Sequence, residues 1–86
     1  MEKDMQNKFI ANRIKQLASD HNITISKLAK SAGINKSTIN NIMNSGIVPT
    51  ISTVFSICSA LNMTLPEFFD FYPYNKKEAS SEAPIK

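Results

Sequence analysis

Hydrophobic residues recur at helical spacing along most of the chain. Ile10, Ile14, Leu17 and Ala18 follow the spacing i, i+4, i+7, i+8, which puts them in one stripe of an amphipathic helix. The stripe predicts a first helix over residues 7–21. No sustained alternation of apolar and polar residues indicates a strand.

Two short helices are expected next, separated by a glycine. Thr24 is a suitable N-cap for the second helix, and Gly33 stands where a left-handed residue closes it. Asn35 is a suitable N-cap for the third helix, which the run 44–46 ends. The face of the third helix that is expected in the core consists of Ile39, Ile42 and Met43.

The remaining pattern predicts two more helices. Thr50 follows a proline and is expected to cap a fourth helix, whose apolar positions again have helical spacing: Val54, Ile57, Cys58 and Leu61. Thr64 and Glu67 form a capping box with a proline in the first turn. This box predicts a fifth helix that extends through Phe68, Phe69 and Phe71.

These elements predict an all-α fold, a compact five-helix bundle in one domain of residues 7–74. Residues 1–6 are expected to be an N-terminal extension, and residues 75–86 a polar, disordered tail. The chain begins without an apolar signal region and has no stretch long and apolar enough to span a membrane. A cytoplasmic location is therefore expected.

Several kinds of chemistry are excluded by what the sequence lacks. Cys58 is the one cysteine and His21 the one histidine, so neither an intramolecular disulfide nor a zinc site of usual spacing can form. There is no nucleophile motif, no phosphate-binding glycine loop and no close pair of carboxylates. We expect no metal, no cofactor, no small-molecule substrate and no enzymatic activity.

The third predicted helix has a polar face that suits the edges of DNA bases. At 100° per residue, Ser37, Asn41 and Asn44 lie within about 40° of one direction, opposite the apolar face. Asparagine can bond adenine N6 and N7, Lys36 can reach a guanine or a phosphate, and the methyl group of Thr38 can touch that of thymine. The formal net charge is +3, and between residues 8 and 63 six basic residues face one acid. This balance permits a polyanionic partner.

Several segments together resemble the Cro and phage-repressor family of five-helix DNA-binding domains. They are RIKQL of residues 13–17, ITISKLA of residues 23–29, GINKSTINNI of residues 33–42, Pro49-Thr50, and LNMTLPEFF of residues 61–69. The resemblance covers about residues 8–71 and implies a lambda-repressor-like helix-turn-helix fold. It implies that the base edges are contacted by Lys36, Ser37, Thr38, Asn41 and Asn44. It also implies homodimers on palindromic sites.

We expect phosphate contacts from a second set of residues, namely Arg13, Ile25, Ser26, Lys27 and Asn40. The sequence departs from the family at Ile25, where a glutamine is usual, so that only backbone N–H groups remain there for a phosphate. A family ion pair between the first and third helices is replaced by the apolar Ala18 and Met43, which can be equally stable because buried ion pairs are costly to desolvate. The loop of residues 45–49 is neutral, although this loop is commonly basic in the family.

A long uncharged stretch suggests self-association. No charged residue lies between Lys36 and Glu67, and exposed surfaces of this length normally carry Lys and Glu. We expect a homodimer whose interface includes Ile47, Val48, Asn62, Met63, Phe68, Phe71 and Tyr72. The alternative is that the aromatic residues fold inward and the chain is monomeric away from DNA.

The sequence thus predicts a sequence-specific double-stranded DNA-binding protein, a transcriptional repressor that is associated with the nucleoid. Its operator is expected to be an inverted repeat that is rich in A·T pairs. An alternative from another class stays open, in which the same scaffold is a protein-interaction module such as an antitoxin or adaptor, with residues 68–74 as its surface.

Overall fold

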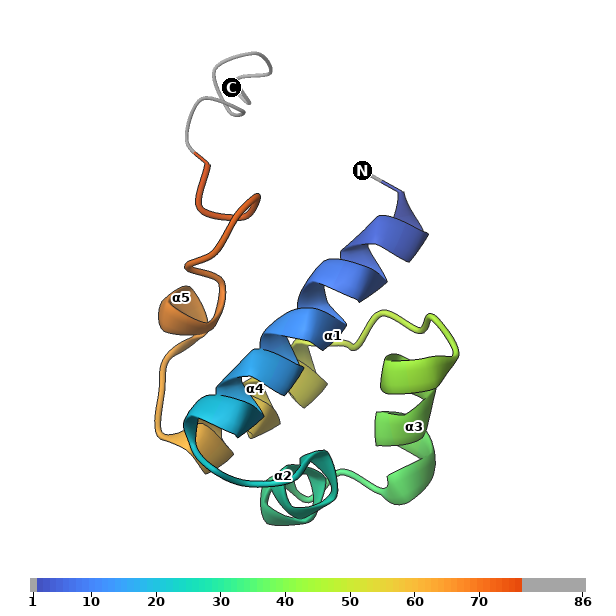
Figure 1. Cartoon of the computed structure of the whole chain (residues 1–86), viewed down its shortest axis with the longest axis vertical. Coiled ribbons are helices and arrows are strands. Elements are labelled where there is room, and N and C mark those ends of the chain that lie inside the picture. Colours follow the sequence, from blue (N-terminus) through green and yellow to red (C-terminus); the bar gives the residue numbers. More distant parts are fainter. Residues whose placement is uncertain (1, 77–86) are drawn as a thin grey trace.

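The computed structural model describes residues 2–76, and within that range it is built from helices without strands. The helices are α1 (Lys3–Asp20), α2 (Ile25–Ala32), α3 (Lys36–Asn44), α4 (Ile51–Leu61) and α5 (Leu65–Phe68). Figure 1 shows α1 running through the middle of the bundle, with α3 on one side and α5 on the other. The predicted all-α, five-helix fold is confirmed, whereas the predicted tail lies almost entirely outside the described residues.

The predicted capping residues begin four of the helices. The side chains of Thr24, Asn35, Thr50 and Thr64 each accept a hydrogen bond from the backbone N–H three residues further on. Glu67 completes the capping box by accepting from the backbone N–H of Thr64 at 2.8 Å. Gly33 closes α2 with φ 73°, a left-handed conformation that costs glycine little. These local signals are therefore used as the sequence predicts.

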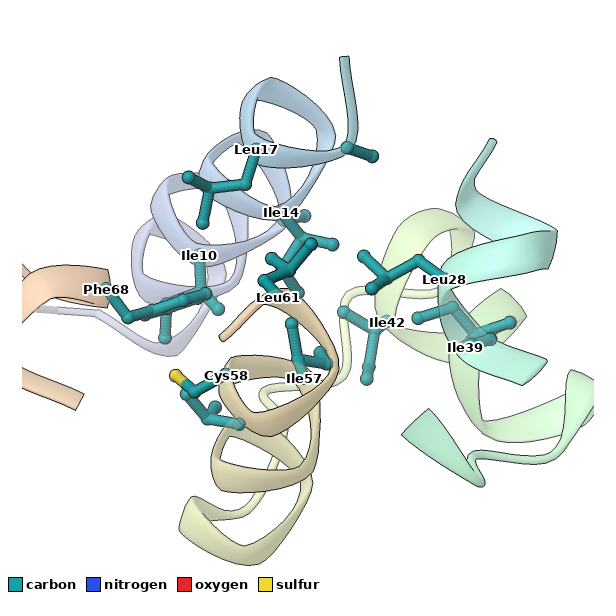
Figure 2. Packing of buried hydrophobic residues seen from close by; sticks show 14 residues of the cluster. Ile10, Ile14, Leu17, Leu28, Ile39, Ile42, Ile57, Cys58, Leu61 and Phe68 are labelled. Atoms are coloured by element: carbon teal, nitrogen blue, oxygen red, sulfur yellow. The ribbon is translucent and has the colours of Figure 1, made fainter. Parts of the chain in front are cut away.

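One hydrophobic core joins all five helices. Its buried residues include the predicted apolar stripes of α1, α3 and α4 and the first phenylalanine of α5. Figure 2 shows the labelled members converging from the different helices: Ile10, Ile14, Leu17, Leu28, Ile39, Ile42, Ile57, Cys58, Leu61 and Phe68. Ala18 is buried in this core and Met43 packs against it, so apolar packing occupies the positions of the family's ion pair.

Helix α1 begins four residues earlier than the apolar stripe predicts. The first residue of the predicted apolar stripe is Ile10, but Asn7, one turn before it, is also buried, with 7% of its surface exposed. The buried face of α1 therefore continues through a polar residue. No helix within residues 2–76 is long and apolar enough to cross a membrane.

Helix α5 is shorter than predicted and ends at Phe68, and its last two carbonyl groups are bonded to a side chain of α1. Arg13 donates from Nε to the carbonyl of Phe68 and from Nη2 to that of Glu67, both at 2.8 Å. A longer helix would pair these carbonyls with backbone N–H groups four residues on. The guanidinium also lies 5.3 Å from the ring centroid of Phe71.

The aromatic residues after α5 pack back onto α1, and this corrects part of the predicted dimer interface. Phe68 has no exposed surface, so it cannot contact a second copy of a folded chain. Phe69 and Phe71 are half-buried, and the ring of Tyr74 packs edge-on against both and against Phe9 of α1. The alternative of inward-folded aromatic residues thus describes most of this segment.

Candidate nucleic-acid interface

Helices α2 and α3 form a helix-turn-helix. The turn after α2 is closed by Gly33, and the backbone N–H of Ile34 returns to the carbonyl of Ala29 at 2.9 Å. Ala29 is buried, and its small side chain lets α3 approach α2 closely. Figure 1 shows α3 rising from the end of α2 at the side of the bundle away from α5. The second helix of the motif is therefore presented at the surface.

The outer face of α3 carries the polar side chains that the sequence predicts for it. The exposed residues on this helix are Lys36, Ser37, Asn40, Asn41 and Asn44, whereas Thr38 is half-buried. Within residues 2–76, the side-chain amides of Asn41 and Asn44 form no hydrogen bonds with the protein. The donors and acceptors of these amides are therefore free for an external partner. Amide groups on the surface of a helix can reach base edges when the helix lies in the major groove.

Basic and hydroxyl side chains gather where α2 meets α3. Ser26, Lys30 and Lys36 border one hollow of about 320 Å³ between the two helices. Lys27 is exposed in the first turn of α2, and its backbone N–H is bonded to the cap residue Thr24. Ile25 is half-buried and packs against the core. The structure thus brings two predicted residues, Ser26 and Lys36, to the border of one hollow, and Lys27 follows Ser26 in the first turn of α2.

A further basic residue, Lys8 of α1, lies beside the other end of α3. It borders a hollow of about 370 Å³ together with Asp4, Asn44 and Gly46. Lys8 is one of the six basic residues between residues 8 and 63 that favour a polyanionic partner. It lies within the predicted first helix, but its place beside α3 depends on contacts between helices, which residue spacing within one helix cannot show.

Arg13 is held on a different side of the molecule from this face. Its guanidinium bonds two carbonyls at the end of α5 and the side chain of Gln16. These contacts provide hydrogen-bond partners for the guanidinium in the absence of a phosphate. Its predicted phosphate contact stays a prediction that competes with them.

The predicted dimer residues other than Phe68 are at least partly exposed. Ile47 and Tyr72 are 51% and 65% exposed, Asn62 is exposed, and Val48, Met63 and Phe71 are half-buried. Two further exposed hydrophobic residues were missed, Ile51 and Phe55 of α4, at 64% and 58%. They are one turn apart and flank the buried stripe, so apolar residues outside that stripe were the available signal.

Two groups have shifted pKa values, and both lie away from the α3 face. Burial raises the pKa of the Cys58 thiol, and the nearby charge of Glu67 adds to this shift. Burial also raises the pKa of Tyr74. Among the described residues, no group of three His, Cys, Asp or Glu side chains is arranged to hold a metal ion.

Comparisons with known proteins agree with this geometry. The model of the Cro/C1-type HTH DNA-binding domain matches residues 13–74. The structure is similar to one described as the crystal structure of the prophage Lp1 protein 11, with a TM-score of 0.78 and 35% sequence identity. That similarity covers 83% of this chain and 95% of the other. No curated protein matches the sequence. This chain belongs to the family of Cro/C1-type helix-turn-helix DNA-binding domains.

Proposed function

We propose that the protein is a transcriptional repressor without enzymatic activity, which reads a specific double-stranded DNA sequence with α3 in the major groove. The observation that carries this proposal is the outer face of α3, where exposed amide side chains have no hydrogen-bond partner among residues 2–76. The major groove admits an α-helix and distinguishes all four base pairs. A face without acidic residues meets no electrostatic barrier there.

Base contacts are assigned to the exposed side chains of α3. Asn41 and Asn44 read adenine through N6 and N7, Lys36 reaches guanine or a phosphate, and the shorter side chains complete the surface: Ser37 and Thr38. Helix α3 contains no arginine, the residue most often used for guanine. We therefore expect A·T pairs at most contacted positions.

Phosphate contacts are assigned to groups on both sides of α3. Ser26, Lys27 and the backbone N–H groups near Ile25 serve one strand at the start of α2, and Asn40 contributes from α3. Lys8 is added because it borders the same hollow as Asn44. A protein that neutralises several phosphates binds less tightly as salt concentration rises.

A homodimer is proposed through an apolar surface, which we call the α4 strip and define as Ile47, Ile51 and Phe55. The exposure of these three side chains supports it, as does an adjoining hollow of about 570 Å³ that Phe55, Met63 and Leu65 help to line. A two-fold interface pairs a surface with itself, so a charged surface would repel its copy. The uncharged α4 strip would not. Two copies of α3 about 34 Å apart would read an inverted repeat with half-site centres about 10 base pairs apart.

Selection of bound duplexes from a random library tests the proposal. We expect enrichment of an inverted repeat whose conserved positions are mostly A·T. A consensus dominated by G·C would overturn the role given to the asparagines and favour Lys36 as the main reader. If no sequence is enriched at low salt, the proposed repressor function is wrong and the protein-interaction alternative is favoured.

A further inference from the structure

A buried amide of α1 is bonded to the end of α3. Asn7 is 7% exposed, and its Nδ2 donates to the carbonyl of Ile42 at 2.9 Å and to that of Ile47 at 2.6 Å. Both partners are acceptors, so the NH₂ group and not Oδ1 must face them. Asn7 also precedes residues 13–74, the part of the chain that the family model matches. The family model therefore does not include Asn7.

The two carbonyls lack the partners that a longer helix would give them. Ile42 lies in the last turn of α3, where carbonyl groups have no backbone N–H four residues on within the helix. Gly46 then turns the chain with φ 75°, and the backbone N–H groups of Ser45 and Ile47 both return to the carbonyl of Asn41. Asn7 thus bonds the chain on both sides of this turn and joins it to α1.

We propose that Asn7 is a positioning residue for sequence readout, which fixes the direction of the last turn of α3. That turn carries Asn44 and follows Asn41, the two amides assigned to base contacts. Base contacts depend on the direction of the side chain, whereas phosphate contacts carry little sequence information. Loss of the Asn7 amide leaves the two carbonyl groups without their protein donor, so the last turn of α3 becomes less rigid. Specific DNA binding then weakens more than non-specific binding.

This inference rests on the proposed function, and a purely structural role for Asn7 is its competitor. If Asn7 only stabilises the fold, its loss would lower the melting temperature without changing the preference of the folded protein for its operator. The two roles differ in the ratio of the dissociation constants for random and operator duplexes. That ratio is the quantity to measure.

The test compares Asn7→Ala with Ile57→Val, a control that removes one methylene from the core in α4. Both ratios are measured well below the melting temperatures, so that both variants are folded. We expect Asn7→Ala to reduce the ratio about tenfold or more, as the loss of one base contact does, and Ile57→Val to leave it unchanged. An equal ratio in the two variants would overturn the proposal.

Two further measurements keep the outcome decisive. Asn7→Ser retains one donor for one carbonyl, so it should fold more readily than Asn7→Ala and give an intermediate ratio; a wild-type ratio in this variant counts against the proposal. Amide hydrogen exchange without DNA should show faster exchange at Ser45 and Ile47 in the Asn7 variants than in Ile57→Val. If wild type prefers no duplex, the proposed function fails by itself. Unchanged exchange at the two amides refutes the role of Asn7 whatever the DNA result.

Discussion

The outer faces of α3 and α4 come from the same uncharged stretch of sequence but carry different chemistry. On α3 the exposed residues are amides and a hydroxyl, with Lys36 at the start of the helix. On α4 the exposed residues include Ile51 and Phe55, each more than half exposed. Apart from Lys36, both faces lack the charged residues that normally cover a solvated helix.

The difference indicates two kinds of partner. The amides of α3 have no hydrogen-bond partner in the described part of the chain, and such groups suit a surface that presents its own donors and acceptors, as base edges do. Exposed apolar groups gain free energy when they leave water, which marks a protein contact. Absence of charge therefore suggests that a surface is covered by a partner, and the types of side chain on the surface indicate whether that partner is DNA or protein.

The largest effect is expected from a charge in the α4 strip. Phe55→Glu would put like charges opposite each other in a two-fold interface, which costs several kcal/mol. We expect a monomer by sedimentation and a loss of operator affinity of about a hundredfold or more. Asn12→Glu adds the same charge on an exposed position of α1 and should change neither. Unaltered association of Phe55→Glu would show that the second copy binds elsewhere.

A smaller effect is expected from Arg13, which lies on the side of α1 that faces α5, away from the outer faces of α3 and α4. Arg13→Ala removes two charge-assisted hydrogen bonds to carbonyls, so the free energy of unfolding should fall by about 1.5–3 kcal/mol. The lower value is favoured because the guanidinium is partly exposed. Arg13→Lys should rescue little, because an ammonium cannot form the same fork.

The same variant decides between the two roles of Arg13. Titrations of random DNA at several salt concentrations should give the wild-type slope if the guanidinium serves α5. A slope reduced by about one, with stability unchanged, would instead support the phosphate contact that the sequence predicts.

The smallest effect concerns the inner side of α4 and the end of the chain packed on α1. Burial raises the pKa of Cys58 above its ordinary 9.0 and that of Tyr74 above its ordinary 10.0. The unfolded chain therefore releases these protons first, and stability that is complete below pH 9 falls as pH rises further. Cys58→Ala should flatten the first part of this decline in urea titrations, and Tyr74→Phe the later part. Equal slopes in variants and wild type would show that these groups are not shifted.

Most of the fold could be predicted because its signals are local. Thr24, Asn35 and Thr50 act through N–H groups three residues away, and the buried stripes repeat within each helix. The polar face of α3 was predictable for the same reason, since one helix period decides which residues share a side.

What the sequence missed depends on contacts between distant segments. Asn7 bonds residues 35 and 40 positions away, and Arg13 bonds residues 54 and 55 positions away. No periodicity contains such pairs, so these hydrogen bonds could not be predicted. Ile51 and Phe55 were missed because an apolar residue outside the buried stripe was not counted.

Asn41 on α3 is the side chain whose proposed base contact is most open to a direct test. The most direct measurement is a cycle in which wild type and Asn41→Ala are titrated against the operator and against duplexes with one base pair changed at a time. We predict that the substitution costs about 1–3 kcal/mol on the operator, and that this cost disappears at a single A·T position and persists at all others. An equal cost on every duplex, random DNA included, would contradict base reading by Asn41.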